Sequence, residues 1–263
     1  MVLIKRRLLC LLFSILLVSG SLAVEAAESI ISVLPEEQLY QIAIVTPQGE
    51  EEYVYDVLFQ VDKSSGQVLV TTTGSGYTME SRYDQDLKLL QSEMLVVQER
   101  DVARVGFDRR SSVYDPEENR IFLAFYLNDR LQDTREIYLK EEGTEIEVLG
   151  IYLQSLLLQN RTDFHGNLVD LNGTGRYILD SSVLADKQVS DLARKKNTAP
   201  QIQELLADPD QVEVFSIGYD GILRWFFPTR FYVVLEAEAP HRILAFWAGS
   251  GDLLRYHLYR YQE

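Results

Sequence analysis

The side chains that could carry chemistry in this sequence form no recognised catalytic or metal-binding motif. The three histidines are His165, His241 and His257, and none has a second histidine or a carboxylate at the close spacing of a local zinc motif. His165 follows Asp163 in a predicted loop, and His241 follows Pro240 in a predicted tight turn. We therefore expect structural or solvent-facing histidines, and we identify no catalytic residue, no metal ligand and no cofactor-binding residue.

Serine and glycine patterns also indicate no nucleophile and no phosphate loop. The sequence contains no Gly-x-Ser-x-Gly elbow. Gly74, Ser75 and Gly76 stand between two predicted strands rather than before a helix, so a turn accounts for them.

Carboxylates are numerous, with 40 Asp and Glu residues, so a general acid and base could be found by number alone. A carboxylate-based hydrolase of envelope polymers therefore stays open as an alternative function. Three acidic clusters also offer the hard oxygen ligands that Ca²⁺ prefers, but turn formation accounts for each of them without a metal. The clusters are Asp84 with Asp86, Asp115 with Glu117 and Asn119, and Asp208 with Asp210.

Aromatic residues are the group most informative about ligand binding. The chain has 15 tyrosines, 11 phenylalanines and 2 tryptophans, and aromatic residues are concentrated over 225–261. They could line a groove for an apolar or glycan ligand, or they could fill the core of a sheet, where aromatic side chains are favoured. The candidates for a ligand groove are Trp225, Phe227, Tyr232, Phe246, Trp247 and Tyr256.

The first 26 residues have the three parts of a secretory signal. A basic start at 5–7 is followed by an apolar stretch over 8–20 and then by small residues. Cleavage after Ala26 makes Ala27 the first residue of the mature chain, and cleavage after Ala27 is the close alternative. The apolar run of about 13 residues is shorter than the roughly 20 that a membrane-spanning helix needs. We therefore expect a cleaved signal rather than a membrane anchor.

The expected mature chain is cysteine-free and strongly acidic. The single cysteine, Cys10, lies within the signal, so the domain has no disulfide and no thiolate site, which favours a bacterial envelope protein. The whole chain has a net charge of −15; removing three basic residues and Glu25 with the signal leaves 22 basic and 39 acidic residues, a net of about −17. Such a surface repels phosphate backbones, so nucleic acid is excluded as a partner. We expect the protein to work in the periplasm or outside the cell.

Short apolar runs that alternate with turn residues predict a mainly β protein. In the run 53–61 every second residue is apolar or aromatic, which places Tyr53, Tyr55 and Val57 on one face of a strand. Asn172-Gly173 is a hairpin signal, and the runs after 212 have connections short enough for a meander. The predicted strands are 40–45, 53–61, 68–73, 77–83, 87–98, 113–114, 121–127, 137–140, 146–148, 168–171, 177–179, 212–217, 222–227, 231–238, 243–248 and 253–261.

One region of the mature chain has a clear helical pattern. Residues 183–207 predict two amphipathic helices, the second beginning with a capping box formed by Thr198 and Gln201. The run 149–159 fits a buried helix or a central strand, and we favour a helix. We therefore expect one domain over 27–263, a curved antiparallel sheet or half-barrel covered by one or two helices, with 183–207 as a helical insertion.

Two parts of the sequence resemble a family of uncharacterised bacterial exported proteins, the domain of unknown function 3108 family. They are the strand-turn-strand at 81–89 and the ending that includes 227–228, 239–244 and 256–258. Sheets of this kind are similar in outline to the periplasmic lipoprotein carriers, in which a curved half-barrel holds helices and an acyl chain. The resemblance implies an extensive antiparallel sheet, and it transfers no catalytic residue to this chain.

The leading hypothesis is an exported, non-enzymatic envelope protein whose curved sheet binds a lipid or another apolar or amphiphilic ligand, with 183–207 as plug or lid. One alternative is a protein–protein module that supports assembly of an envelope complex through exposed sheet edges. The other is the carboxylate-based hydrolase.

Overall fold

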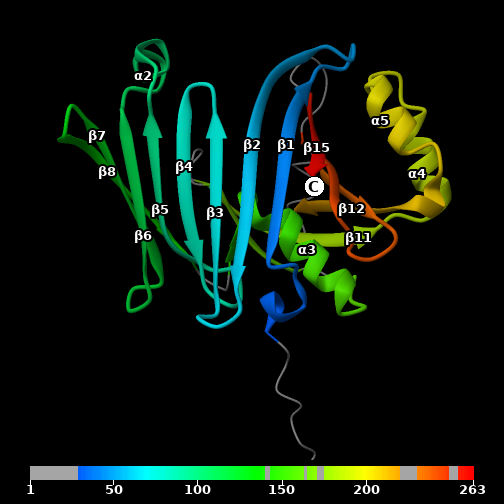
Figure 1. Ribbon diagram of the computed structural model, residues 1–263, viewed down its shortest axis with the longest axis horizontal. Helices are drawn as coiled ribbons and strands as arrows, with labels where there is room; N and C mark the ends of the chain where they lie inside the picture. The colour runs from blue at the N-terminus through cyan, green and yellow to red at the C-terminus, as the bar shows by residue number, and fades with distance from the viewer. Residues whose placement is uncertain (1–28, 140–142, 163–164, 171–174, 220–229, 249–253) are drawn as a thin grey trace, which may run out of the picture.

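The computed structural model describes residues 29–139, 143–162, 165–170, 175–219, 230–248 and 254–263 (Figure 1). The predicted signal at 1–26, the turn at 172–173 and the predicted strand 222–227 therefore lie outside the described residues. No helix in the described part of the chain has both the length and the apolar character needed to span a bilayer.

A single curved sheet dominates the structure. Its first eight strands form a meander in which each strand pairs antiparallel with the next. They are β1 (Glu37–Val45), β2 (Glu51–Asp62), β3 (Gln67–Gly74), β4 (Tyr77–Tyr83), β5 (Leu89–Val96), β6 (Arg109–Asp115), β7 (Arg120–Leu127) and β8 (Arg130–Tyr138).

The remaining strands extend the sheet from the other side of β1. They are β9 (Gly143–Glu145), β10 (His165–Asp170), β11 (Gly175–Val183), β12 (Val212–Tyr219), β13 (Phe231–Glu236), β14 (Ile243–Ala248) and β15 (Arg255–Gln262). The order is β8-β7-β6-β5-β4-β3-β2-β1-β15-β14-β13-β12-β11-β10-β9, so that β8 and β9 are the two edges of an open sheet. All described pairs are antiparallel except β9 with β10.

The expectation of a mainly β fold with a curved antiparallel sheet and a few helices is confirmed. In Figure 1 the strands β11 and β12 run across the direction of β1 to β6, which shows how strongly the sheet bends. The helical segments are η1 (Ile30–Val33), α2 (Glu99–Val105), η2 (Ile146–Val148), α3 (Leu149–Leu158), α4 (Asp186–Ala193), α5 (Pro200–Leu205) and η3 (Pro209–Gln211).

Helix α3 packs against the concave face of the sheet. The run 149–159 is helical, as predicted, and α3 is apolar on nearly all sides, which is typical of a buried helix. Leu149, Ile151 and Leu153 join one core cluster with residues of both parts of the sheet, including Tyr40 of β1. Gly150 permits this close approach, since a Cβ there would lie 2.5 Å from Cδ1 of Ile243.

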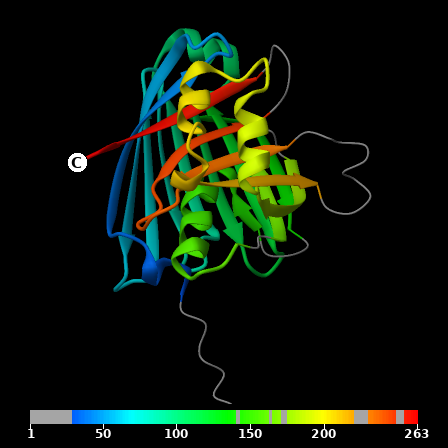
Figure 2. The ribbon, with the colours of Figure 1, turned by 90° about the vertical axis from the view of Figure 1, so that its right-hand side faces the viewer.

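Helices α4 and α5 cover the opposite face (Figure 2). Along β1, Tyr40 and Ile42 belong to the cluster around α3, whereas Ala43 and Val45 belong to a second cluster with α4 and α5. The two helices predicted over 183–207 are present. They do not lie on the face that α3 occupies, so the expectation of a plug or lid on the concave face is wrong.

Three local predictions are also wrong. Residues 146–148 form the 3₁₀ turn η2 instead of a strand. The predicted strand 87–98 stops at Val96, and helix α2 follows it. The capping box at α5 is absent, because Thr198 Oγ1 donates to the carbonyl of Leu192 and Gln201 Nε2 donates to the carbonyl of Gly49.

Candidate functional site

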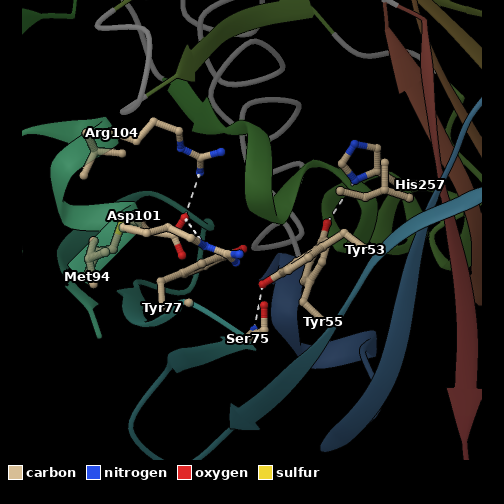
Figure 3. Close-up of a pocket in the computed structure, with 13 residues that line it drawn as sticks. Tyr53, Tyr55, Ser75, Tyr77, Met94, Asp101, Arg104 and His257 are labelled. Atoms are coloured by element: carbon tan, nitrogen blue, oxygen red, sulfur yellow. Dashed lines mark hydrogen bonds and ion pairs between the residues drawn. The ribbon is translucent and has the colours of Figure 1, made fainter. Parts of the chain in front are cut away.

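A cavity of about 430 Å³ opens on the concave face, between the sheet and helix α2 (Figure 3). Three of its lining residues form one row across the sheet, because Ile44 of β1 lies opposite His257 of β15 on one side and opposite Tyr53 of β2 on the other. The lining residues are Ile44, Tyr53, Tyr55, Ser75, Gly76, Tyr77, Met94, Val96, Arg100, Asp101, Arg104, Val105 and His257.

A neutral hydrogen-bonded pair, Tyr55 and His257, lines this cavity. The hydroxyl of Tyr55 and Nδ1 of His257 are 2.9 Å apart, and the rings of Tyr55 and Phe246 both meet the imidazole edge-on. Burial lowers the pKa of His257 from 6.5 to about 4. Burial is also the largest cause of the raised pKa of Tyr55. At neutral pH the pair therefore offers hydrogen-bonding groups without a charge.

The carboxylate of Glu147, which is not among the residues that line the cavity, adds a negative potential to this region. Burial is the main cause of the raised pKa of Tyr77 and of Tyr55, and the charge of Glu147 in η2 raises both further. The neighbouring Glu145 is buried and accepts a hydrogen bond of 2.5 Å from the hydroxyl of Tyr83. Glu145 and Glu147 come from one short segment, and neither is among the residues that line the cavity.

The turn between β3 and β4 shapes one side of the cavity. The hydroxyl of Tyr53 accepts a hydrogen bond of 2.8 Å from the backbone N–H of Ser75. A Cβ on Gly74 would overlap with this hydroxyl, and a Cβ on Gly76 would overlap with the carboxylate of Asp101. Close packing around a turn thus explains both glycines. This agrees with the prediction that they belong to a turn and not to a phosphate loop.

Helix α2 forms the mouth of the cavity. The carboxylate of Asp101 lies 3.6 Å from Nε of Arg100 and 3.9 Å from a terminal nitrogen of Arg104. Both arginine side chains are 78% exposed, whereas Asp101 is only 18% exposed. The helix buries none of its own residues and ends at Gly106, whose φ of 83° favours glycine.

A second cavity of about 360 Å³ adjoins the first on the concave face. Met94 of β5 and Val105 of α2 line both cavities. The rings of Phe107 and Phe125 pack edge to face at 5.2 Å in the second cavity. Its lining residues are Met94, Val105, Gly106, Phe107, Phe125, Gln132, Asp133 and Arg135.

The six aromatic candidates are not all on one surface. Tyr232, Trp247 and Tyr256 lie together beneath α4 and α5. The ring centroid of Trp247 is 5.1 Å from that of Tyr232 and 5.5 Å from that of Tyr256. The Tyr256 hydroxyl there donates to the carbonyl of Asn197. Phe246 is on the concave face beside His257. Trp225 and Phe227 lie outside the described residues.

Each acidic cluster considered for calcium binds the N–H groups of its own turn. Asp84 accepts from Asp86 and Lys88. Asp115 likewise accepts from residues 117 and 118, and Asp208 accepts from residue 210. Within the described residues, no group of three or more His, Cys, Asp or Glu side chains could hold a metal ion.

Sequence reasoning missed the cavity residues as a site. Tyr53 and Tyr55 were correctly predicted to share a strand face, which was the available signal. The pairing of β1 with β15 that brings His257 to them has no local signature in the sequence, because its partners are far apart along the chain.

Comparisons with known proteins found matches of low sequence identity among solved structures. No family model and no curated protein matches the chain. A crystal structure of a beta-barrel-like protein of the domain of unknown function DUF1849 from Brucella abortus is 10% identical, with a TM-score of 0.46, and the match covers 87% of this chain and 96% of that chain.

A structure of DNA polymerase III subunit beta from Borrelia burgdorferi, in complex with a natural product, is 8% identical, with a TM-score of 0.15, and the match covers 91% of this chain and 59% of that chain. Neither match confirms the resemblance to the domain of unknown function 3108 family, and neither bears on function.

Proposed function

We propose that this protein is an exported, non-enzymatic envelope protein that binds a small amphiphilic ligand in the cavity beside α2. The observation that carries the proposal is the composition of that cavity. Apolar side chains such as Ile44, Met94 and Val96 form walls, and the neutral Tyr55–His257 pair supplies hydrogen bonds inside. Its volume of about 430 Å³ is in the range of small-molecule sites, which combine apolar walls with a few placed polar groups.

A binding assay with a pair of matched variants tests this proposal. The mature chain is titrated with N-phenyl-1-naphthylamine, an uncharged fluorescent probe of apolar sites. Val96→Trp fills the cavity, whereas Val97→Trp places the same ring on the neighbouring residue, which is 67% exposed and does not line the cavity. We expect at least about tenfold weaker binding for Val96→Trp, equivalent to about 1.4 kcal/mol, and no change for Val97→Trp. No probe binding, or equal loss in both variants, contradicts the proposal.

The location outside the cytoplasm is part of the proposal and rests on the signal features of residues 1–26. Amino-terminal sequencing of the protein from the envelope fraction tests it, with Ala27 as the expected first residue. Mass spectrometry of the same native preparation should show a retained lipid. Full-length protein in the cytoplasmic fraction contradicts this part.

A protein–protein module is the second candidate, and the edge strand β8 favours it. Eight of the nine residues of β8 are exposed, and in the described part of the chain β8 pairs only with β7. Such an edge can accept a strand from a partner. A photocrosslinking residue at Thr134 of β8, with Ser111 of β6 as the control position, tests it in cells. A reproducible partner that crosslinks at Thr134 but not at Ser111 supports the module.

A further inference from the structure

We infer that the two cavities form one elongated site for a single-chain amphiphile with an uncharged head group. The head lies beside Tyr55 and His257, and the chain passes Met94 beneath α2 to reach Phe107 and Phe125. This inference rests on the proposed function, since it specifies the ligand of the same site.

The continuity of the two cavities is the first observation. Met94 and Val105 are the residues common to both linings, so the two spaces meet at these side chains. Met94 is half-buried, and a flexible thioether side chain can change rotamer to admit a ligand. Together the two volumes come to roughly 800 Å³, which is still within the usual range for ligand sites.

The attachment of α2 leaves room for a chain beneath it. The two residues before α2 are tied to the β3–β4 turn, because Gln98 Nε2 donates to the carbonyl of Ser75 and the N–H of Val97 donates to the carbonyl of Gly76. No residue of α2 is buried, so its second half contributes no side chain to the core. A chain that passes under Val105 therefore displaces no buried side chain of α2.

The second cavity has an apolar wall suited to a hydrocarbon chain. Phe107 and Phe125 form an aromatic pair there, and the guanidinium of Arg135 lies over the Phe125 ring at 4.9 Å from its centroid. This end of the site is bordered by the exposed strand β8, whose Gln132, Asp133 and Arg135 form a polar rim. The arrangement places apolar surface inside and polar groups at the opening.

The charges around the first cavity favour an uncharged head. His257 is neutral when buried and so provides no cation for an anionic head group. The negative charge of Glu147 acts on Tyr55 and Tyr77, which disfavours a second anion beside them. Arg100 and Arg104 are both ion-paired with Asp101 at the exposed mouth and not at the Tyr55–His257 end. A hydroxyl, ester or amide head matches these groups.

A chain-length series tests the inference. Monoacylglycerols with about six, ten and fourteen carbons, and fatty acids of the same lengths, displace the fluorescent probe from the mature chain. Burial of each methylene is worth about 0.8 kcal/mol, so monoacylglycerol affinity should rise by up to about fourfold per methylene until both cavities are filled. The fatty acids should bind at least about tenfold more weakly than the monoacylglycerols of equal length.

Two variants of β8 locate the chain. Gln132→Trp fills the second cavity, whereas Leu131→Trp adds the same ring at a neighbouring residue that is 57% exposed and lies outside both linings. We expect Gln132→Trp to remove the gain from the longer chains and to leave the six-carbon ligand unaffected. Leu131→Trp should leave the whole series unchanged.

The outcomes separate this inference from the proposed function. If neither the probe nor any ligand of the series binds, the proposed function fails. If the probe and the short ligand bind, but affinity does not rise with chain length or Gln132→Trp has no effect, only the elongated site is overturned. Equal or tighter binding of the fatty acids overturns the uncharged head.

Discussion

Replacing His257 with asparagine should remove a defined part of the pH dependence of stability. Burial lowers the pKa of His257 in the folded protein to about 4, against 6.5 in the unfolded chain. Between these values the unfolded chain binds a proton that the folded protein does not bind, so the free energy of unfolding decreases as the pH falls from about 6.5 to about 4. At about 1.4 kcal/mol per pKa unit, the full loss is about 3 kcal/mol, of which about 2 kcal/mol develops between pH 7 and pH 5.

Urea unfolding followed by intrinsic fluorescence at a series of pH values measures this loss. Asparagine at 257 cannot titrate and keeps a polar group for Tyr55 near the position of Nδ1. His241→Asn is the matched control, because it removes a histidine from a turn outside the cavity and asparagine tolerates the φ of 56° there. Carboxylates titrate in all three proteins, so the difference between their slopes isolates His257. If His257→Asn and His241→Asn keep the same slope between pH 7 and pH 5, the reasoning about His257 is refuted.

Three substitutions test the packing that supports the site. Gly150→Ala should destabilise the fold by about 1–2 kcal/mol in urea unfolding, because the new methyl group meets Ile243. The loss should shrink when Ile243→Val removes the Cδ1 atom, and equal losses in both backgrounds contradict this contact. Tyr83→Phe should cost about 1–3 kcal/mol by removing the hydroxyl that donates to buried Glu145, and a loss well below this range in thermal unfolding argues against the hydrogen bond. Gly49→Ala should cost about 1 kcal/mol in the same assay because its φ is 87°, whereas an unchanged midpoint would show that the turn can relax.

The strands were predictable where one of their faces is buried. In β2, Val57, Phe59 and Val61 are buried and alternate with less buried residues, so the period of two is present in the sequence. In β8 only Ile137 is buried, and the sequence predicted only the end of this strand. An exposed edge strand has no apolar face, and therefore it leaves no alternating pattern.

The helices show the same dependence on burial. The pattern of 183–207 was visible because Val189, Leu192 and Ile202 form apolar stripes against the sheet. Helix α2 buries no residue and so has no stripe to reveal it. A helix at 149–159 was predicted, and a buried one was considered, but its place on the concave face was not predicted. The amphipathic helices suggested a lid, whereas a helix that is apolar on nearly all sides is the one that enters a concave core.

The site was less predictable than the fold because it depends on pairing between distant segments. Tyr53 and Tyr55 were assigned to one face, but that face acquires a cavity only when β15 brings His257 to Ile44 and α2 covers the other side. Strand pairing over such a separation depends on the whole chain and not on a local pattern. Counting aromatic residues therefore directed attention to the opposite face, where Trp247 packs beneath α4 and α5.

The pairing of β1 with β15 has a consequence for folding during synthesis. Tyr40 and Tyr261 are partners in this pair, so roughly 220 residues separate two strands that must meet in the middle of the sheet. A chain that emerges from the ribosome amino terminus first presents β1 with one edge open until almost all of the sequence has been made. Contacts of this separation slow folding, and an open strand edge favours aggregation. The central seam of the sheet is thus the place where a holdase chaperone would protect the newly made chain.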